Sequence, residues 1–200
     1  MYRFFETIRI EEGKALHLKY HEERMRRTSI AYLGGVPFPS LKGMIQVPAN
    51  VRDKVFKCRI TYSRSLEDIV IEPYRPKYIR SLKLVADNKI DYSFKWNDRS
   101  ELNKLLQLKG NCDDIIIVKN GLITDGSYAN LVFRKGDQFL TPANPLLKGV
   151  MRQVLLESGV IKPAIIHEND ISAFSHVFLI NAMNPLDRAV SLPINKIIGF

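Results

Sequence analysis

The sequence predicts an α+β protein with two domains, because segments with the composition of strands outnumber the segments with helical spacing. Its 200 residues suffice for one large domain or two small ones, and 46% hydrophobic residues with ten phenylalanines fit a globular interior. The stretch Glu72–Lys77 holds two prolines and reads as a linker. We therefore expect an N-terminal domain over residues 1–73, a linker over 74–77 and a C-terminal domain over 78–200.

The N-terminal part begins with Phe4–Ile10, an alternating run rich in strand-forming residues, and a turn follows at Glu11–Gly13. Charged and apolar residues then recur at helical spacing from Leu18 to Leu33, where two glycines end the helix. Three further elements are expected here: a helix in the region of Val51, and a pair of strands over 57–62 and 69–73.

In the C-terminal part, one helix is expected over 100–108, with Ser100 as its N-cap, and another over 149–158, ended by Gly159. The dipeptide Asn120-Gly121 predicts a tight hairpin turn. Strands are expected over 81–85, 115–118, 122–124, 131–133, 138–141 and 176–181.

The net charge of +9 is compatible with a nucleic-acid-binding protein or with a site for small anions. The lysines and arginines are spread along the whole chain, and no basic recognition helix or aromatic-basic RNA motif emerges. We therefore favour a small anionic substrate, since excess positive charge raises the local concentration of anions. No nucleic acid and no metal ion are expected as partners.

The cellular setting is suggested by two cysteines and by the hydropathy pattern. Cys58 and Cys112 lie in apolar, strand-like surroundings, which suits buried thiols in a reducing cytoplasm better than a disulfide framework. There is no long apolar run and no signal-peptide profile at the N-terminus, so no membrane contact is expected.

Two segments carry the candidate chemistry. Lys95 lies in Asp91–Arg99, and thirty residues later the chain reads Gly121-Leu-Ile-Thr-Asp-Gly, with Asp125 as the acidic residue. A lysine can form a Schiff base with a carbonyl group, and a carboxylate can hold a pyridinium nitrogen protonated. Pyridoxal phosphate (PLP) needs both partners, because it withdraws electrons only when its ring nitrogen is charged.

The order and spacing of these segments resemble the fold-type IV PLP enzymes, which include branched-chain and D-amino-acid aminotransferases and aminodeoxychorismate lyase. The resemblance implies a small N-terminal α/β domain and a larger, barrel-like C-terminal domain. It further implies PLP as cofactor, Lys95 as the catalytic lysine, an amino-acid-type substrate and a homodimer. A stretch that helps to wall the substrate pocket in longer relatives would precede Phe5 and is missing here, which leaves the substrate open.

The resemblance also assigns the groups that would hold the cofactor. His21-Glu-Glu-Arg24 is similar to the segment in which a helix presents an arginine, here Arg24, to the PLP phosphate. Read alone, this segment could be a solvated helix face, because Arg26 and Arg27 follow closely. Leu147–Arg152 is similar to the segment in which a glycine starts a helix whose first amides, here those of Val150 and Met151, bind the phosphate.

Asp125 stands where most of the family has glutamate. Either carboxylate can pair with the pyridinium nitrogen, although the aspartate side chain is one methylene shorter. Read without the resemblance, Asp125-Gly126 is simply a turn signal.

The segment Ile180–Leu186 separates the members of the family. Aminotransferases of this fold tend to have small hydroxyl residues or glycine here, whereas the lyases carry an asparagine-alanine pair and then a methionine-proline-like stretch. This chain reads Asn181-Ala182 and then Met-Asn-Pro, which is closer to the lyases. Asn181 and Ala182 are therefore expected to contact the cofactor.

Three functions stay open from the sequence. The first is an aminodeoxychorismate lyase, which releases pyruvate and 4-aminobenzoate for folate synthesis. The second is an aminotransferase for branched-chain or D-amino acids. The third is a binding module, for PLP or nucleic acid, that kept the scaffold without the activity.

Overall fold

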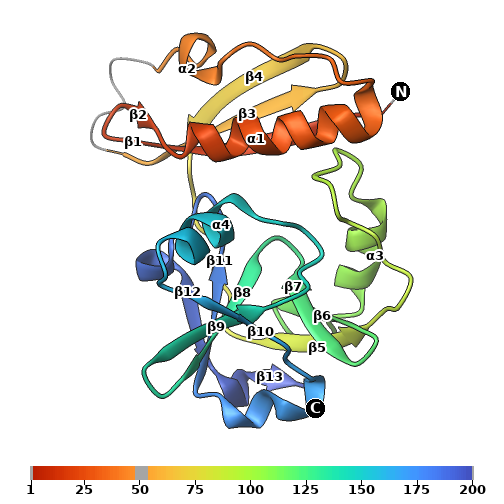
Figure 1. Cartoon of the computed structure of the whole chain (residues 1–200). Helices are drawn as coiled ribbons and strands as arrows, with labels where there is room; N and C mark the ends of the chain where they lie inside the picture. Colours follow the sequence, from red (N-terminus) through yellow and green to blue (C-terminus); the bar gives the residue numbers. More distant parts are fainter. Residues whose placement is uncertain (1, 48–53, 200) are drawn as a thin grey trace. The chain divides into compact units, whose positions relative to one another are not determined.

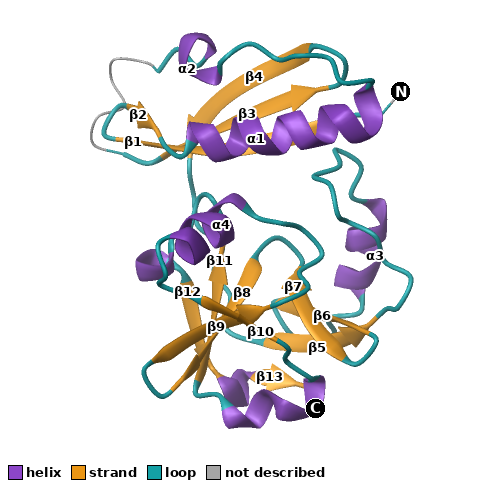
Figure 2. Ribbon diagram, in the orientation of Figure 1, coloured by secondary structure: helices purple, strands orange, loops and turns teal. Residues whose placement is uncertain are grey.

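The computed structural model of the chain describes residues 2–47 and 54–199, and the helix expected near Val51 lies outside them. The described chain contains both helices and strands, which confirms the α+β class (Figures 1 and 2). It divides into two compact units: Met1–Pro76 with Phe94–Asp98, and Lys77–Ser93 with Arg99–Phe200. Each unit is described by itself below.

The first unit is built on an antiparallel sheet of four strands among the described residues. Phe4, Ile8 and Ile10 alternate along the first strand and are fully buried, and they belong to the apolar core of the unit. The predicted turn before the second strand is present, with Gly13 at φ 73°. In sheet order the strands are β2 (Lys14–Ala15), β1 (Phe4–Glu11), β3 (Phe56–Tyr62) and β4 (Leu66–Pro73).

A helix lies along this sheet and closes its core (Figure 1). The helix α1 spans Leu18–Thr28 and continues as a wider, π-helical turn over Ser29–Leu33, so the predicted end at Leu33 is confirmed. Gly34 follows at φ 79°, a conformation in which glycine avoids the strain of a side chain. Met25 and Leu33 from this segment join the buried residues of the strands, and a single turn, α2 (Leu41–Met44), adds Leu41.

The segment Phe94–Asp98 groups with the first unit, although the predicted boundaries placed it in the C-terminal domain. The reason is backbone pairing with the start of β1. The Phe5 N–H donates to the Lys95 carbonyl at 3.0 Å, and the Asn97 N–H donates to the Arg3 carbonyl at 2.9 Å. The lysine that the sequence singles out is therefore held by strand-like hydrogen bonds to β1.

The second unit holds a sheet of nine strands among the described residues, in mixed parallel and antiparallel order. Figure 2 shows these strands crossing around a common core. That core is lined by buried aliphatic and aromatic residues, with Leu131, Phe133 and Val177 among them. In chain order the strands are β5 (Leu82–Ala86), β6 (Asp114–Lys119), β7 (Leu122–Gly126), β8 (Asn130–Lys135), β9 (Gln138–Pro142), β10 (Lys162–Ala164), β11 (His176–Ile180), β12 (Val190–Pro193) and β13 (Ile197–Ile198).

The described residues of this unit contain two α-helices: α3 (Ser100–Gln107) and α4 (Val150–Glu157). The prediction of Ser100 as N-cap was wrong, because Ser100 is already helical and Arg99 takes the cap position without a side-chain cap bond. For α4 the cap is Gly149, and Gly159 follows its end at φ 72°. Short 3₁₀ turns lie at Glu168–Ala173, Leu186–Arg188 and Ile194–Lys196.

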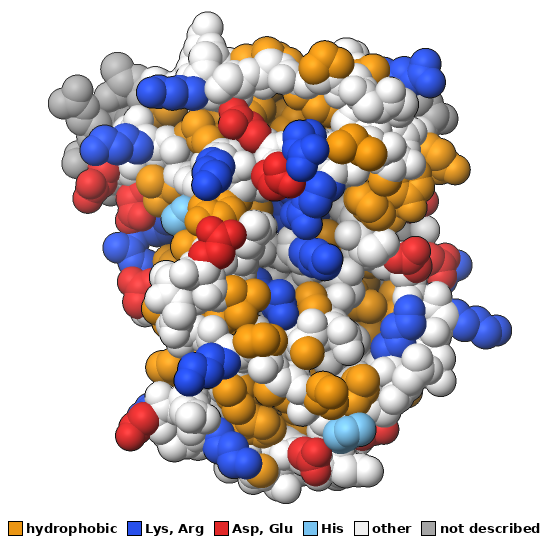
Figure 3. Space-filling model, viewed as in Figure 1, with side chains coloured by type: hydrophobic (Ala, Val, Ile, Leu, Met, Phe, Trp, Pro, Cys, Tyr) orange, Lys and Arg blue, Asp and Glu red, His pale blue; other side chains and the backbone are white. Residues whose placement is uncertain are grey.

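The distribution of charged side chains and the burial of the two cysteines agree with what the sequence indicated. Basic and acidic side chains occur near each other on the face of both units that Figure 3 shows. Cys58 and Cys112 are free and buried, as predicted, and burial raises the pKa of the Cys58 thiol to about 11. None of the helices in the described chain is both long and apolar enough to cross a membrane.

Candidate active site

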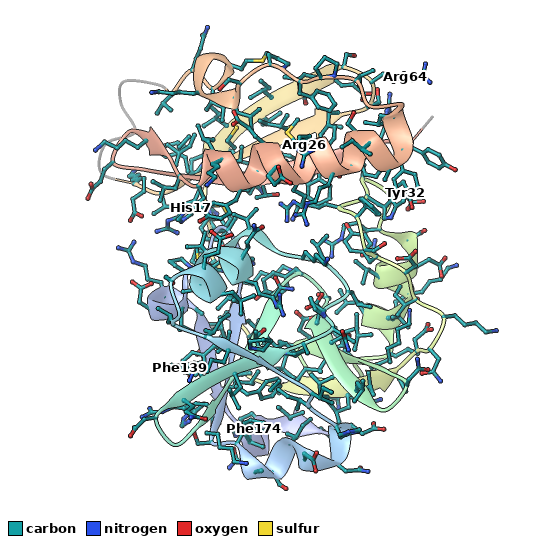
Figure 4. The ribbon with its side chains drawn as sticks, in the orientation of Figure 1. His17, Arg26, Tyr32, Arg64, Phe139 and Phe174 are labelled. Carbon is teal, nitrogen blue, oxygen red and sulfur yellow. The ribbon has the colours of Figure 1, made fainter. Side chains whose placement is uncertain are left out.

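Lys95 is half-buried and lies against an aromatic ring. Its Nζ is 4.8 Å from the centroid of the Phe5 ring, a distance at which an ammonium group is attracted by the ring face. The neighbouring Trp96 packs against Phe4, with ring centroids 4.5 Å apart. Tyr32, labelled in Figure 4, adds edge-on contacts to Phe94 and Trp96. This aromatic cluster fixes the backbone on both sides of Lys95.

A fully buried carboxylate, Glu6, organises the adjoining part of the first unit. Arg24 donates from Nε to Glu6 Oε1 at 2.8 Å and from Nη2 to Oε2. The Nδ1 of His21 lies 2.6 Å from Glu6 Oε2. Glu6 shares the core-facing side of β1 with Phe4 and Ile8, so its charge must be met by partners from α1.

The charges of this cluster follow from burial and pairing. Burial alone would raise the pKa of Glu6, but the charge and hydrogen bonds of Arg24, with those of His21, lower it to about 2. Burial lowers the pKa of His21, against its contact with Glu6, so we take the imidazole as neutral at pH 7. The cluster is then a paired carboxylate and guanidinium with a neutral histidine beside them.

The position of Arg24 decides between the two interpretations of its segment. Arg24 is buried, whereas Arg26, labelled in Figure 4, is exposed and pairs with Glu23 on the outer side of α1. Arg24 is thus not a solvated helix residue.

In the second unit, Asp125 is a buried strand residue and not part of a turn. It lies on β7 opposite Asn130 of β8 and is 5% exposed. Its Oδ1 accepts from Asn130 Nδ2 at 2.7 Å, and its Oδ2 accepts from the Leu147 N–H at 2.8 Å. Burial raises its pKa to about 6, against these hydrogen bonds and the charge of Arg152, which lower it.

The start of α4 supplies backbone donors next to this carboxylate. Val150 and Met151 are its first two residues, and both are buried. Helix geometry leaves the first amides without intrahelical partners, and the N-cap Gly149 has no side chain to accept from them. Such a helix start attracts anions, because its first N–H groups have no intrahelical acceptor and the helix dipole favours negative charge.

Asn181 and Ala182 form the tight turn after β11. The Asn181 Oδ1 accepts from the N–H groups of Met183 and Asn184 at 2.8 and 3.0 Å. Its Nδ2 lies 3.4 Å from the Tyr128 carbonyl in the turn between β7 and β8. The side chain of Asn181 therefore shapes its own turn and connects it to the hairpin that carries Asp125.

The structure thus gathers the predicted residues into two groups, one in each unit. Arg24 and Lys95 both lie near His21 in the first unit, where their charges act on its pKa. Asp125, Val150, Met151, Asn181 and Ala182 form the group in the second unit. Sequence reasoning missed Glu6, His21 and Asn130, although a glutamate on the apolar face of an alternating strand could have indicated a paired buried carboxylate.

The family is shown by comparison with known proteins. The sequence model of the class IV amino-transferases matches residues 3–192, and the chain belongs to this family. An uncharacterized protein of Haemophilus influenzae is 39% identical over 188 residues, which cover 93% of this chain and all of the relative. Membership of this family implies a PLP-dependent enzyme, either a lyase or a transferase.

Solved structures show the same fold. A protein of Haemophilus somnus, provisionally named 4-amino-4-deoxychorismate lyase, matches with a TM-score of 0.84 and 37% identity, over 93% of this chain and 98% of the other. A hypothetical aminotransferase of Mycobacterium tuberculosis in its PLP-bound form matches with a TM-score of 0.77 and 18% identity, over 98% and 81%. The predicted fold-type IV architecture is therefore confirmed.

The residues present fit PLP. A buried carboxylate with a raised pKa gains a counter-charge from a pyridinium nitrogen, and an uncapped helix start accepts a phosphate. A lysine held by backbone bonds against an aromatic ring is suited to bond a carbonyl carbon. Among the residues that the structure describes, no group of three side chains could hold a metal ion.

Proposed function

We propose that this chain is a PLP-dependent lyase that converts 4-amino-4-deoxychorismate to 4-aminobenzoate and pyruvate. The observation that carries the proposal is the turn at Asn181-Ala182. The side chain of Asn181 accepts hydrogen bonds from backbone N–H groups of its own turn. Aminotransferases of this fold tend to have a hydroxyl residue or glycine at this position. The likeness to the Haemophilus somnus protein, which carries the lyase name, supports the same choice.

Lys95 is the residue we assign to the reaction itself. PLP, when bound, supplies an electron sink for the carbon that bears the substrate's amino group. Lys95 takes the proton from that carbon as general base. The bond to the ether oxygen then breaks, the enolpyruvate leaves with the electron pair and takes up a proton to become pyruvate. The remaining ring becomes aromatic, which drives the step.

The other predicted residues would bind and orient the cofactor. Asp125 would hold the pyridine nitrogen protonated, and its own raised pKa falls when a positive charge lies beside it. Arg24 and the amides of Val150 and Met151 would bind the phosphate. Asn181 and Ala182 would contact the cofactor through their turn.

The cofactor assignment is tested by binding and labelling. Purified protein mixed with PLP should show the absorbance of a lysine-bonded cofactor, and borohydride reduction should leave the pyridoxyl group on the peptide that contains Lys95. Lys95→Ala should lose both signals, whereas Lys42→Ala, at an exposed lysine of α2, should keep them. Label on another lysine, or none on the wild type, would refute the assignment.

The reaction is tested by product analysis. Incubation with 4-amino-4-deoxychorismate should yield 4-aminobenzoate and pyruvate, identified by mass, and a parallel panel of L- and D-amino acids should yield no keto acid. Accumulation of pyridoxamine phosphate with an amino acid alone would indicate an aminotransferase instead. Salt-sensitive binding of RNA or DNA without turnover would indicate a binding module.

We further propose a cytoplasmic homodimer that takes a small anionic amino-acid-type substrate. The family resemblance supports the dimer, and the buried free thiols suit a reducing compartment. Light scattering of the purified protein should give twice the chain mass of 23.0 kDa. A monomer at micromolar concentration would contradict the dimer, and recovery outside the cytoplasmic fraction would contradict the location.

A further inference from the structure

A single side-chain amide joins Asp125 to the segment that starts α4. Asn130 is buried at the beginning of β8, and its Nδ2 donates twice: to Asp125 Oδ1 at 2.7 Å and to the Leu147 carbonyl at 2.8 Å. The Leu147 N–H in turn donates to Asp125 Oδ2 at 2.8 Å. Carboxylate, amide and backbone thus form a closed ring of hydrogen bonds.

The other end of the same amide meets Gly149. A Cβ built on Gly149 would lie 1.9 Å from Asn130 Oδ1, far inside van der Waals contact. The backbone there has φ −71° and ψ 147°, values that any L-residue adopts. Glycine at this position is therefore required by the closeness of Asn130 and not by backbone conformation.

Three near replacements for Asn130 would not reproduce these contacts. Aspartate has the same shape but no donor for the Asp125 carboxylate or for the Leu147 carbonyl. Alanine removes the donors and leaves a space beside Gly149. Glutamine is longer by one methylene, which the contact with Gly149 does not allow.

We propose that Asn130 is a positioning residue that sets the Asp125 carboxylate and the first amides of α4 at a fixed spacing. This inference rests on the proposed function, in which Asp125 serves the pyridine nitrogen and those amides serve the phosphate. The ring nitrogen and the phosphate of PLP belong to one molecule and are joined by a short CH₂–O linker of limited reach, so the two protein groups must lie within a narrow range of distances from each other. The Asn130 amide, with Gly149 packed against it, holds the two groups at this spacing.

The first test uses the protein without cofactor. The carboxyl pKa of Asp125 is followed by NMR of ¹³C-labelled aspartate, with the signal assigned from Asp125→Asn. Asn130→Ala removes a donor to the carboxylate, so the pKa of Asp125 should rise by about one pH unit. Asn103→Ala, at an exposed position of α3, should leave it unchanged. An unchanged pKa in Asn130→Ala would overturn the inference.

The second test is a double-mutant cycle read by PLP affinity. Gly149→Ala should weaken PLP binding by about tenfold or more, because its methyl group displaces the Asn130 amide. Added to Asn130→Ala, the same change should have little further effect, since the clash is gone. Fully additive losses of PLP affinity would show that Asn130 and Gly149 act independently. They would overturn the proposal that the two residues together fix the spacing.

A third variant covers the case in which Asn130→Ala folds poorly. Asn130→Asp keeps the shape and should bind PLP at least tenfold more weakly than the wild type, with thermal unfolding measured alongside. Wild-type affinity in Asn130→Asp would refute the role of the donors. If the wild type itself binds no PLP, the proposed function fails, and the NMR experiment still decides whether Asn130 holds Asp125.

Discussion

Glu6 and Arg24 form an ion pair through two hydrogen bonds inside the first unit, with the Arg24 Nε 2.8 Å from Glu6 Oε1. One comes from the middle of a strand and the other from the helix that covers it. Because the pair fixes the guanidinium on one side, the orientation of Arg24 exists before any anion binds. Arg24 is therefore both a structural residue and a candidate phosphate ligand, and experiments must separate the two roles.

Arg24→Ala should weaken PLP binding by about ten to a few hundred-fold, because a charge-assisted contact is worth roughly 1.5–3 kcal/mol. It should also lower the free energy of unfolding, since Glu6 stays buried without its charge partner. Fluorescence titration with PLP and urea unfolding without PLP measure the two effects. Arg26→Ala is the exposed control, and equal PLP affinity in both variants would show that Arg24 serves the fold alone.

Glu6 should make stability depend on acid. Its folded pKa is about 2 against an ordinary value of 4.5, so its contribution is complete above pH 4.5 and is lost as the pH falls toward 2. Glu6→Gln should cost about 3–5 kcal/mol at pH 7, because the buried guanidinium of Arg24 then loses the negative charge of Glu6. The difference between variant and wild type should shrink as the pH falls below 4.5. Urea unfolding at pH 7, 4 and 3 measures it, with the exposed Glu23→Gln as control, and a constant difference would contradict the pairing.

Asp125 tests the ring-nitrogen assignment. Asp125→Asn keeps the volume but loses the charge, so turnover should fall much more than PLP affinity, because the phosphate contacts remain. Asp125→Glu should keep considerably more activity, since glutamate is usual in the family. Steady-state kinetics and PLP titration on the same samples separate the effects. Wild-type turnover in Asp125→Asn would mean that another group protonates the ring.

The stability of the protein without PLP should depend on pH through the carboxyl group of Asp125. The folded pKa of Asp125 is about 6 and its ordinary value 3.8, so this group's stabilising contribution is complete below pH 3.8 and is lost as the pH rises through 6. Asp125→Asn should remove that loss. The stability of the apo variant relative to the apo wild type should therefore be higher at pH 7 than at pH 4. Thermal unfolding of both proteins without PLP at these two pH values measures it. A stability difference that does not change with pH would show that Asp125 titrates normally.

Much of the fold was open to prediction from residue patterns, because β1 alternates, α1 has helical spacing and β6 is a continuous apolar run. Strands β2, β10, β12 and β13 were not predicted, since segments of two to four residues show no clear period. The expected cap at Ser100 failed for a similar reason: one residue's preference is weak against the geometry of the chain that leads into α3. Long periodic segments were predictable, and short or terminal features were not.

Candidate site residues were predictable only where the residue type and its own segment of sequence indicate a chemical role. Lys95 and Asp125 stand in recognisable segments, whereas Asn130 acts through contacts with Leu147 and Gly149 that lie 17 and 19 positions along the chain. Gly149 was expected at the helix start, but a one-dimensional pattern could not show that an amide oxygen lies where its side chain would be. Supporting residues of this kind become visible only when strands and helix starts are brought together in space.

The grouping of Phe94–Asp98 with the first unit has a consequence for how the protein can be divided. A fragment that ends at Pro76 holds every strand of the four-stranded sheet but lacks Phe94 and Trp96, which pack on its core, and the strand-like partner of Phe5. Such a fragment would leave aromatic surface uncovered and the edge of β1 unpaired. During synthesis, the packing of this unit is therefore completed only after the residues around Lys95 have emerged.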